Sequence, residues 1–126
     1  MAKRILLIED EDPIRQMYSF ILSKQGYQVV EAIDGEDALV KLKEPGNSFD
    51  VVLLDIMLPK VDGIEVLKQM KAAGSLAKDI PVFVLTNLAQ DDLIEQAKNL
   101  GANDYWVKAN LFPTDLITKL EKFFGD

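Results

Sequence analysis

The sequence predicts an α/β fold in which helices cover both faces of a parallel sheet. Strand and helix signals alternate five times along the 126 residues, the pattern that right-handed β–α–β crossovers produce. Residues 5–8, 51–54 and 82–85 are continuously apolar, which is typical of strands buried on both faces. Because the chain has the length of one domain and shows no linker or internal repeat, we expect a single domain over residues 1–126.

The strand candidates also predict the order of the sheet. They span residues 4–8, 28–32, 51–55, 82–86 and 104–108. The second and fifth candidates contain polar residues, which suits the edges of a sheet, so the order 2-1-3-4-5 fits best. This is the order of flavodoxin-like, doubly wound folds with five helices, and its switch point lies between the first and third strands.

The helices are predicted by their start signals, stop signals and apolar faces. Asp12 is expected to cap the first helix, with Pro13 at its first position. Asp34 and Asp62 begin sequences that resemble capping boxes. Helix ends are expected at Gly26, Gly74 and Gly101. The expected buried faces consist of Ile14, Met17, Tyr18, Ile21 and Leu22 in the first helix and of Leu116, Ile117, Leu120, Phe123 and Phe124 in the last.

Composition excludes several kinds of chemistry. The chain contains no cysteine and no histidine, which excludes disulfides, thiolate nucleophiles, Ser-His-Asp triads and histidine-ligated metals. The net charge of −7 opposes binding to nucleic-acid phosphates and is otherwise explained by ordinary solubility. No apolar stretch approaches the ~20 residues of a membrane span, and the N-terminus lacks a signal-peptide pattern. We therefore expect a cytoplasmic protein that contacts neither nucleic acid nor membrane directly.

Acidic residues follow two strands of the predicted sheet. Glu9 and Asp10 come directly after the first strand, and Asp55 ends the third. Because the carboxyl ends of parallel strands meet at one edge, we expect these side chains to lie together. Clustered carboxylates repel one another unless a cation neutralises them, and Mg²⁺ prefers such oxygen ligands. The alternative is that the acidic run 9–12 only caps the next helix.

Thr86 and Lys108 end the fourth and fifth strands at the same edge. A hydroxyl and an ammonium group beside a carboxylate–magnesium pair would hold the oxygens of a phosphoryl group. Each residue also has a simpler explanation, since threonine often ends a strand and an edge lysine opposes aggregation. Together with Asp55 as a nucleophile, they favour a phosphoryl-transfer site.

Three segments carry a resemblance to a known family. They are ILLIEDEDPIR at residues 5–15, DVVLLDIMLPKVDG at residues 50–63 and GANDYWVK at residues 101–108. Each is similar to a segment of the receiver domains of two-component response regulators. The resemblance covers essentially the whole chain and implies a stand-alone receiver like the chemotaxis regulators, or a piece cut at Asp126 from a longer regulator.

The resemblance implies a role for each residue of the acidic cluster. Asp55 would be the phosphoacceptor. Asp10 and Asp55 would bind Mg²⁺ directly, together with the backbone carbonyl of Met57. Glu9 would act through a bound water.

The resemblance also implies a conformational switch. Thr86 and Lys108 would contact the phosphoryl oxygens, and Tyr105 matches the switch aromatic of the family, although it can also simply pack under a helix. Trp106 is expected to pack rather than to react. Recruitment of Thr86 would let Tyr105 move inward and change the surface formed by the fourth helix, fifth strand and fifth helix.

Partners follow from the same resemblance. A sensor histidine kinase or a histidine phosphotransfer protein must supply the phosphoryl group, because this chain has no histidine. A downstream effector protein would respond to the switch, and the receiver would be a monomer or a phosphorylation-dependent dimer. It would catalyse only its own phosphorylation and dephosphorylation.

Two residues depart from the family pattern. Ala109 stands where the family usually has a proline joined by a cis bond, so we expect a trans Lys108–Ala109 bond, since a non-proline cis bond costs about 3 kcal/mol. Asn87 stands where the family usually has a small residue. We expect Asn87 to shield the phosphoryl group, the alternative being that it orients the attacking water.

Three other interpretations share parts of this pattern. A flavodoxin would have the fold, but the carboxylates of residues 9–11 would repel the FMN phosphate. A haloacid-dehalogenase-like phosphatase would want a second aspartate two residues after Asp55, where this chain has Met57. A phosphate-independent interaction domain could keep the fold, but it would not need the full set of site residues.

Overall fold

A computed structural model describes residues 2–58, 60–86, 91–108 and 111–125. A five-stranded parallel sheet has the order β2-β1-β3-β4-β5, which confirms the predicted fold class. The strands are β1 Arg4–Ile8, β2 Gln28–Ala32, β3 Val51–Asp55, β4 Val82–Thr86 and β5 Asp104–Val107. The helices are α1 Asp12–Lys24, α2 Gly35–Lys43, α3 Gly63–Lys71, α4 Asp91–Asn99 and α5 Pro113–Phe124. None of these helices is long and apolar enough to span a bilayer.

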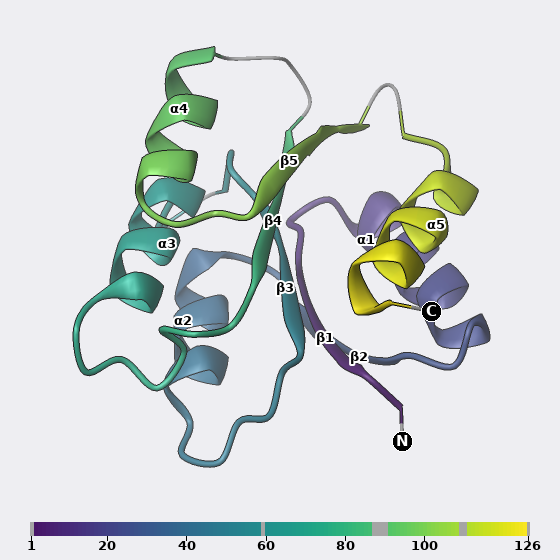
Figure 1. The fold of residues 1–126 in the computed structure, drawn as a ribbon, viewed down its shortest axis with the longest axis horizontal. Coiled ribbons are helices and arrows are strands. Elements are labelled where there is room, and N and C mark those ends of the chain that lie inside the picture. Colours follow the sequence, from purple (N-terminus) through teal and green to yellow (C-terminus); the bar gives the residue numbers. More distant parts are fainter. Residues whose placement is uncertain (1, 59, 87–90, 109–110, 126) are drawn as a thin grey trace.

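The sheet is the middle of three layers (Figure 1). Helices α1 and α5 cover one face, and α2, α3 and α4 cover the other. Successive residues of β1 point to opposite faces, so Ile5 and Leu7 belong to the core beneath α1 and α5 while Leu6 and Ile8 belong to the core beneath α2, α3 and α4. All four side chains are fully buried. This double burial explains why the central strands are continuously apolar.

Helix starts agree with the predicted caps at two places and differ at one. The carboxylates of Asp34 and Asp62 accept hydrogen bonds from backbone N–H groups at the starts of α2 and α3, over 2.7 and 2.9 Å. The prediction that Asp12 caps α1 is wrong, because Glu11 is the N-cap and Asp12 is already helical. The Asp12 carboxylate pairs instead with the guanidinium of Arg15, one turn later in α1.

The buried face of α1 agrees with the predicted one except at Met17, and Ile14 and Ile21 pack against the core as expected. Tyr18 and Leu22 are buried as expected, but Met17 is 41% exposed and Arg15 takes a buried position. The burial therefore follows positions 15, 18 and 22, which lie on one side of a helix with 3.6 residues per turn. In α5 the predicted face is buried except at its end, where Phe123 is 40% exposed.

Gly63, the first residue of α3, lies against the end of β3. Its N–H donates to the carbonyl of Ile56 over 3.0 Å. A Cβ atom at Gly63 would come within 2.5 Å of the Ile56 Cα atom and 2.6 Å of the Asp55 carbonyl oxygen. Because real Cβ atoms do not approach backbone so closely, glycine is what allows α3 to start directly beside Asp55.

Gly63→Ala should therefore lower the free energy of unfolding by about 3 kcal/mol, since the new methyl group forces backbone to move. Gly74→Ala is the matched control. Gly74 has a φ of +83°, but among the described residues only its own chain neighbours lie within 4 Å of the place its new methyl group would take, so the loss should be only about 1 kcal/mol. Urea unfolding followed by circular dichroism measures both. Equal losses for the two variants would show that crowding at the end of β3 is not the cause.

Candidate functional site

The carboxylates of Glu9, Asp10 and Asp55 meet at the carboxyl edge of β1 and β3. One ligand oxygen from each lies within 4.8 Å of the others. Glu9 and Asp55 are 0% and 2% exposed, and Asp10 is partly exposed. Buried carboxylates at this spacing are the donor set that a hard divalent cation takes, with Asp10 open to solvent on one side. The chemistry of these residues therefore fits Mg²⁺.

Lys108 enters this cluster from the end of β5. Its Nζ atom donates to Asp55 Oδ2 over 3.0 Å and forms a very close ion pair with Glu9 Oε1. The strand itself ends at Val107, one residue earlier than the predicted span 104–108. The Lys108 side chain is 6% exposed. Burial alone would lower the pKa of Lys108, but the hydrogen bond to Glu9 and the charge of Asp55 outweigh it and raise that pKa above its ordinary value.

Backbone N–H groups hold the other carboxylate oxygens. Met57 N donates to Asp55 Oδ1 over 3.1 Å, and Glu11 N donates to Glu9 Oε2 over 3.1 Å. Each buried carboxylate therefore has one oxygen on a backbone amide and the other on Lys108. In the described part of the chain, Lys108 is the single cation that pairs with this cluster, through Glu9 and Asp55, while Asp10 adds a third carboxylate, so the site carries excess negative charge.

Thr86 ends β4, the strand that pairs with β3, whereas Tyr105 lies further from this edge on β5, opposite Val84. Thr86 is 2% exposed at the end of β4, opposite Val107 in the register of the sheet. Tyr105 is half-buried against the core beneath α2, α3 and α4, and Lys98 Nζ of α4 lies 5.0 Å from the centroid of its ring. Tyr105 thus connects the edge of the sheet to α4.

Trp106 points to the opposite face of β5. It is 7% exposed and stacks on Phe83, with ring centroids 4.6 Å apart. Because neighbouring residues of a strand alternate between faces, Trp106 packs with α5 while Tyr105 packs toward α4. Its surroundings are those of a packing residue, as the sequence predicts.

Arg15 is the residue near the site that sequence reasoning missed. Its side chain is 9% exposed and its Nη1 atom donates to the backbone carbonyl of Glu9 over 2.9 Å. The sequence could have indicated the burial of Arg15, because positions 15, 18 and 22 share a helical face. An arginine on such an apolar face needs polar partners. Asn87 and Ala109, for which shielding and a trans bond are predicted, lie outside the described residues.

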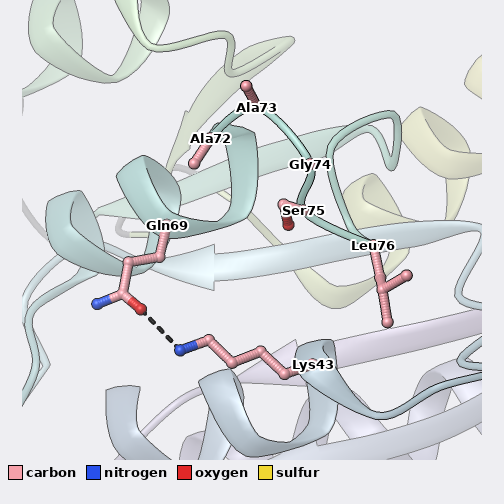
Figure 2. Close-up of a pocket in the computed structure, with 7 residues that line it drawn as sticks. All are labelled: Lys43, Gln69, Ala72, Ala73, Gly74, Ser75 and Leu76. Carbon is pink, nitrogen blue, oxygen red and sulfur yellow. Dashed lines mark hydrogen bonds between the residues drawn. The ribbon is translucent and has the colours of Figure 1, made fainter.

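A hollow of about 390 Å³ lies away from the carboxylates. Figure 2 shows it between the ends of α2 and α3, where Lys43 Nζ donates to Gln69 Oε1 over 2.9 Å. Its remaining lining residues are Ala72, Ala73, Gly74, Ser75 and Leu76. The helices run opposite to the strands, so their C-terminal ends lie at the other edge of the sheet. No carboxylate is among the described residues that line this hollow, so it lacks the acidic cluster of the strand-end site.

Comparisons with known proteins identify the family of this chain. The family described as the response regulator receiver domain matches residues 5–121. The phosphate regulon transcriptional regulatory protein PhoB of Escherichia coli is 40% identical over 121 residues, which cover 96% of this chain and 51% of PhoB. The chain thus spans about half the length of this relative.

Solved structures give the same result. The phosphorylated cyanobacterial phytochrome response regulator RcpA is 30% identical with a TM-score of 0.86, over 98% of this chain and 94% of that one. The receiver domain of the sensor histidine kinase PA1611 from Pseudomonas aeruginosa, solved with a magnesium ion in its active site cleft, is 26% identical with a TM-score of 0.85 over 100% of both chains. On its family match, its fold and its relatives, this chain belongs to the response regulator receiver domains of two-component signalling systems.

Proposed function

We propose that this receiver is a phosphorylation-dependent switch in which Asp55 accepts the phosphoryl group. The observation that carries the proposal is the setting of the Asp55 carboxylate. It lies nearly buried at the end of β3, with one oxygen on the Met57 N–H and the other on Lys108 Nζ. A carboxylate fixed in this way is oriented for in-line attack on phosphorus.

The reaction transfers a phosphoryl group from a phosphohistidine of a partner protein, because this chain contains no histidine. A carboxylate oxygen of Asp55 forms the new P–O bond while the P–N bond to the partner's imidazole breaks, and the imidazole takes up a proton. The product is an aspartyl phosphate, a mixed anhydride that water can hydrolyse. The receiver would catalyse only these two steps.

Lys108 and a bound Mg²⁺ would together neutralise the negative charge of the carboxylates and of the phosphoryl group. Asp10 and Asp55 would hold Mg²⁺ directly together with the Met57 carbonyl, and Glu9 would act through a bound water; the bound ion would neutralise charge on the phosphoryl oxygens. Lys108 would exchange its contact with Asp55 for a phosphoryl oxygen and keep its pair with Glu9. The magnesium in the PA1611 receiver supports this assignment by analogy.

The signal would leave the site through Thr86 and Tyr105. Thr86 would donate its hydroxyl to a phosphoryl oxygen, and Tyr105 would follow it inward. Because the Tyr105 ring packs beneath α4 and under Lys98, its movement would alter the surface formed by α4, β5 and α5. That surface would control an effector protein, with the receiver acting as a monomer or as a phosphorylation-dependent dimer.

The upstream partner would be a sensor histidine kinase or a histidine phosphotransfer protein. The related PhoB is a transcriptional regulatory protein, so one source of an effector is a DNA-binding unit beyond this receiver. The receiver itself, with its net charge of −7, would not bind nucleic acid directly. Its place of action would be the cytoplasm.

Incubation with acetyl phosphate and Mg²⁺ should add one phosphoryl group to the protein, and hydroxylamine should remove it, because an acyl phosphate is labile to that nucleophile. Asp55→Asn should abolish the added mass, since an amide does not attack phosphorus here. Asp92→Asn, which removes an exposed carboxylate of α4, is the control and should be labelled like the parent protein. Intact-protein mass spectrometry gives the answer, and undiminished labelling of Asp55→Asn would falsify the proposal.

Asp10→Asn should raise the free energy of unfolding by about 1 kcal/mol in metal-free buffer, because it removes one carboxylate from a cluster that Lys108 only partly neutralises. Glu11→Gln, an exposed carboxylate next to it, should change stability by less than about 0.5 kcal/mol. Addition of Mg²⁺ should stabilise the parent protein more than Asp10→Asn, since the variant has lost a ligand. Thermal unfolding with and without Mg²⁺ tests this, and destabilisation of metal-free Asp10→Asn would contradict the charge argument.

Beryllofluoride, a phosphoryl mimic, should shift the backbone amide resonances of α4, β5 and α5 far more than those of α2. The reason is that Tyr105 touches α4 from β5, whereas α2 lies away from its strand. Thr86→Ala should confine the shifts to residues around Asp55. Changes already confined to that region in the parent protein would count against the switch.

A further inference from the structure

The proposed reaction gives no role to Arg15, although its side chain contacts the backbone of Glu9 at the site. Its guanidinium is nearly buried and contacts three parts of the fold. It donates to the Glu9 carbonyl at the end of β1 over 2.9 Å, donates to Glu31 Oε1 of β2 over 3.0 Å and pairs closely with Asp12 of α1. Burying a charge is costly unless it is paired and hydrogen-bonded, so this environment is specified by several partners at once.

The carbonyl that Arg15 holds belongs to the peptide unit joining Glu9 to Asp10. The Glu9 N–H donates to the Ala32 carbonyl of β2 over 3.1 Å, and its side chain lies between Lys108 and the Glu11 N–H. With the Arg15 bond added, the backbone N–H, the carbonyl and the side chain of Glu9 are all fixed. The orientation of this peptide decides the direction in which the chain, and with it the Asp10 carboxylate, leaves β1.

Charge alone does not account for the arrangement. The carboxylates of Asp12 and Glu31 already contact the guanidinium, so its single positive charge is more than balanced locally. Little of that charge is left to attract the acidic cluster. The hydrogen bond to the Glu9 carbonyl is directional, however, and it is the contact that reaches the site.

We propose that Arg15 is a positioning residue for the metal and phosphoryl site: by holding the Glu9 carbonyl, it sets the Glu9–Asp10 peptide so that the Asp10 carboxylate faces Asp55. This inference rests on the proposed function. Arg15 touches neither metal nor phosphoryl group and acts through one peptide unit.

Arg15→Met, which keeps the length of the side chain but removes its donors, should weaken Mg²⁺ binding about tenfold, the effect typical of losing a group that orients a ligand. Arg15→Lys should fall between this variant and the parent, because one ammonium group can still reach one acceptor. Glu31→Gln is the matched control: it removes a charged partner of Arg15 but leaves the Glu9 carbonyl bond, so its affinity should stay within twofold of the parent. Backbone amide NMR titrations with Mg²⁺ give the dissociation constants of the folded proteins.

An unchanged Mg²⁺ affinity in Arg15→Met, or an equal loss in Glu31→Gln, would overturn the inference. If Arg15→Met does not fold, Arg15→Lys decides: a loss of at least threefold supports positioning, and a parent-like affinity overturns it. A second measurement needs no metal. The carbonyl ¹³C resonance of Glu9 should move, and the Asp10 amide should become more mobile, in the Arg15 variants but not in Glu31→Gln.

Parent-like values for both metal-free measurements would overturn the inference even if the proposed function holds. Conversely, failure of the parent protein to bind Mg²⁺ would count against the proposed function, and the metal-free comparison would then decide the role of Arg15 by itself.

Discussion

Lys108 binds the carboxylates of Glu9 and Asp55 at the edge of the sheet, and this contact connects the chain after β5 to the ends of β1 and β3. The two carboxylates are almost completely buried, so they need hydrogen-bond donors and a nearby cation. Lys108 supplies the cation, and two backbone N–H groups supply the remaining donors. One ammonium group thereby ties the inner strands of the sheet to its edge strand.

The same contact leaves the negative charge of the three carboxylates only partly neutralised. One lysine faces three carboxylates, so a further cation is favoured, and the Asp10 side is the one open to solvent. A phosphoryl group arriving at Asp55 would find a metal and an ammonium group beside it and would compete for Lys108. Under the proposed function, Lys108 would hold an Asp55 oxygen before phosphorylation and a phosphoryl oxygen after it. This is the kind of bistable local change that a fold can transmit to a surface.

The fold and the meeting of the site carboxylates could be predicted from the sequence, because apolar strand patterns indicate burial and the alternation of strands and helices indicates topology. The apolar central strands predict double burial, and the parallel sheet then brings Glu9 and Asp55 together whatever the details of packing. Two details of α1 failed. Asp12 pairs with Arg15 one turn later in the same helix and does not cap it. Arg15 is buried and Met17 is exposed, and the buried guanidinium has a tertiary partner in Glu31 of β2.

The central claim is that Asp55 itself carries the phosphoryl group, and chemical trapping tests it most directly. Borohydride reduces an aspartyl phosphate to homoserine, so the modified position can be identified by sequencing peptides from the labelled protein in a mass spectrometer. We predict homoserine at position 55 after treatment with acetyl phosphate and Mg²⁺, and aspartate there when the phosphoryl donor is omitted. Homoserine at Asp10 or at another carboxylate, with position 55 unchanged, would contradict it.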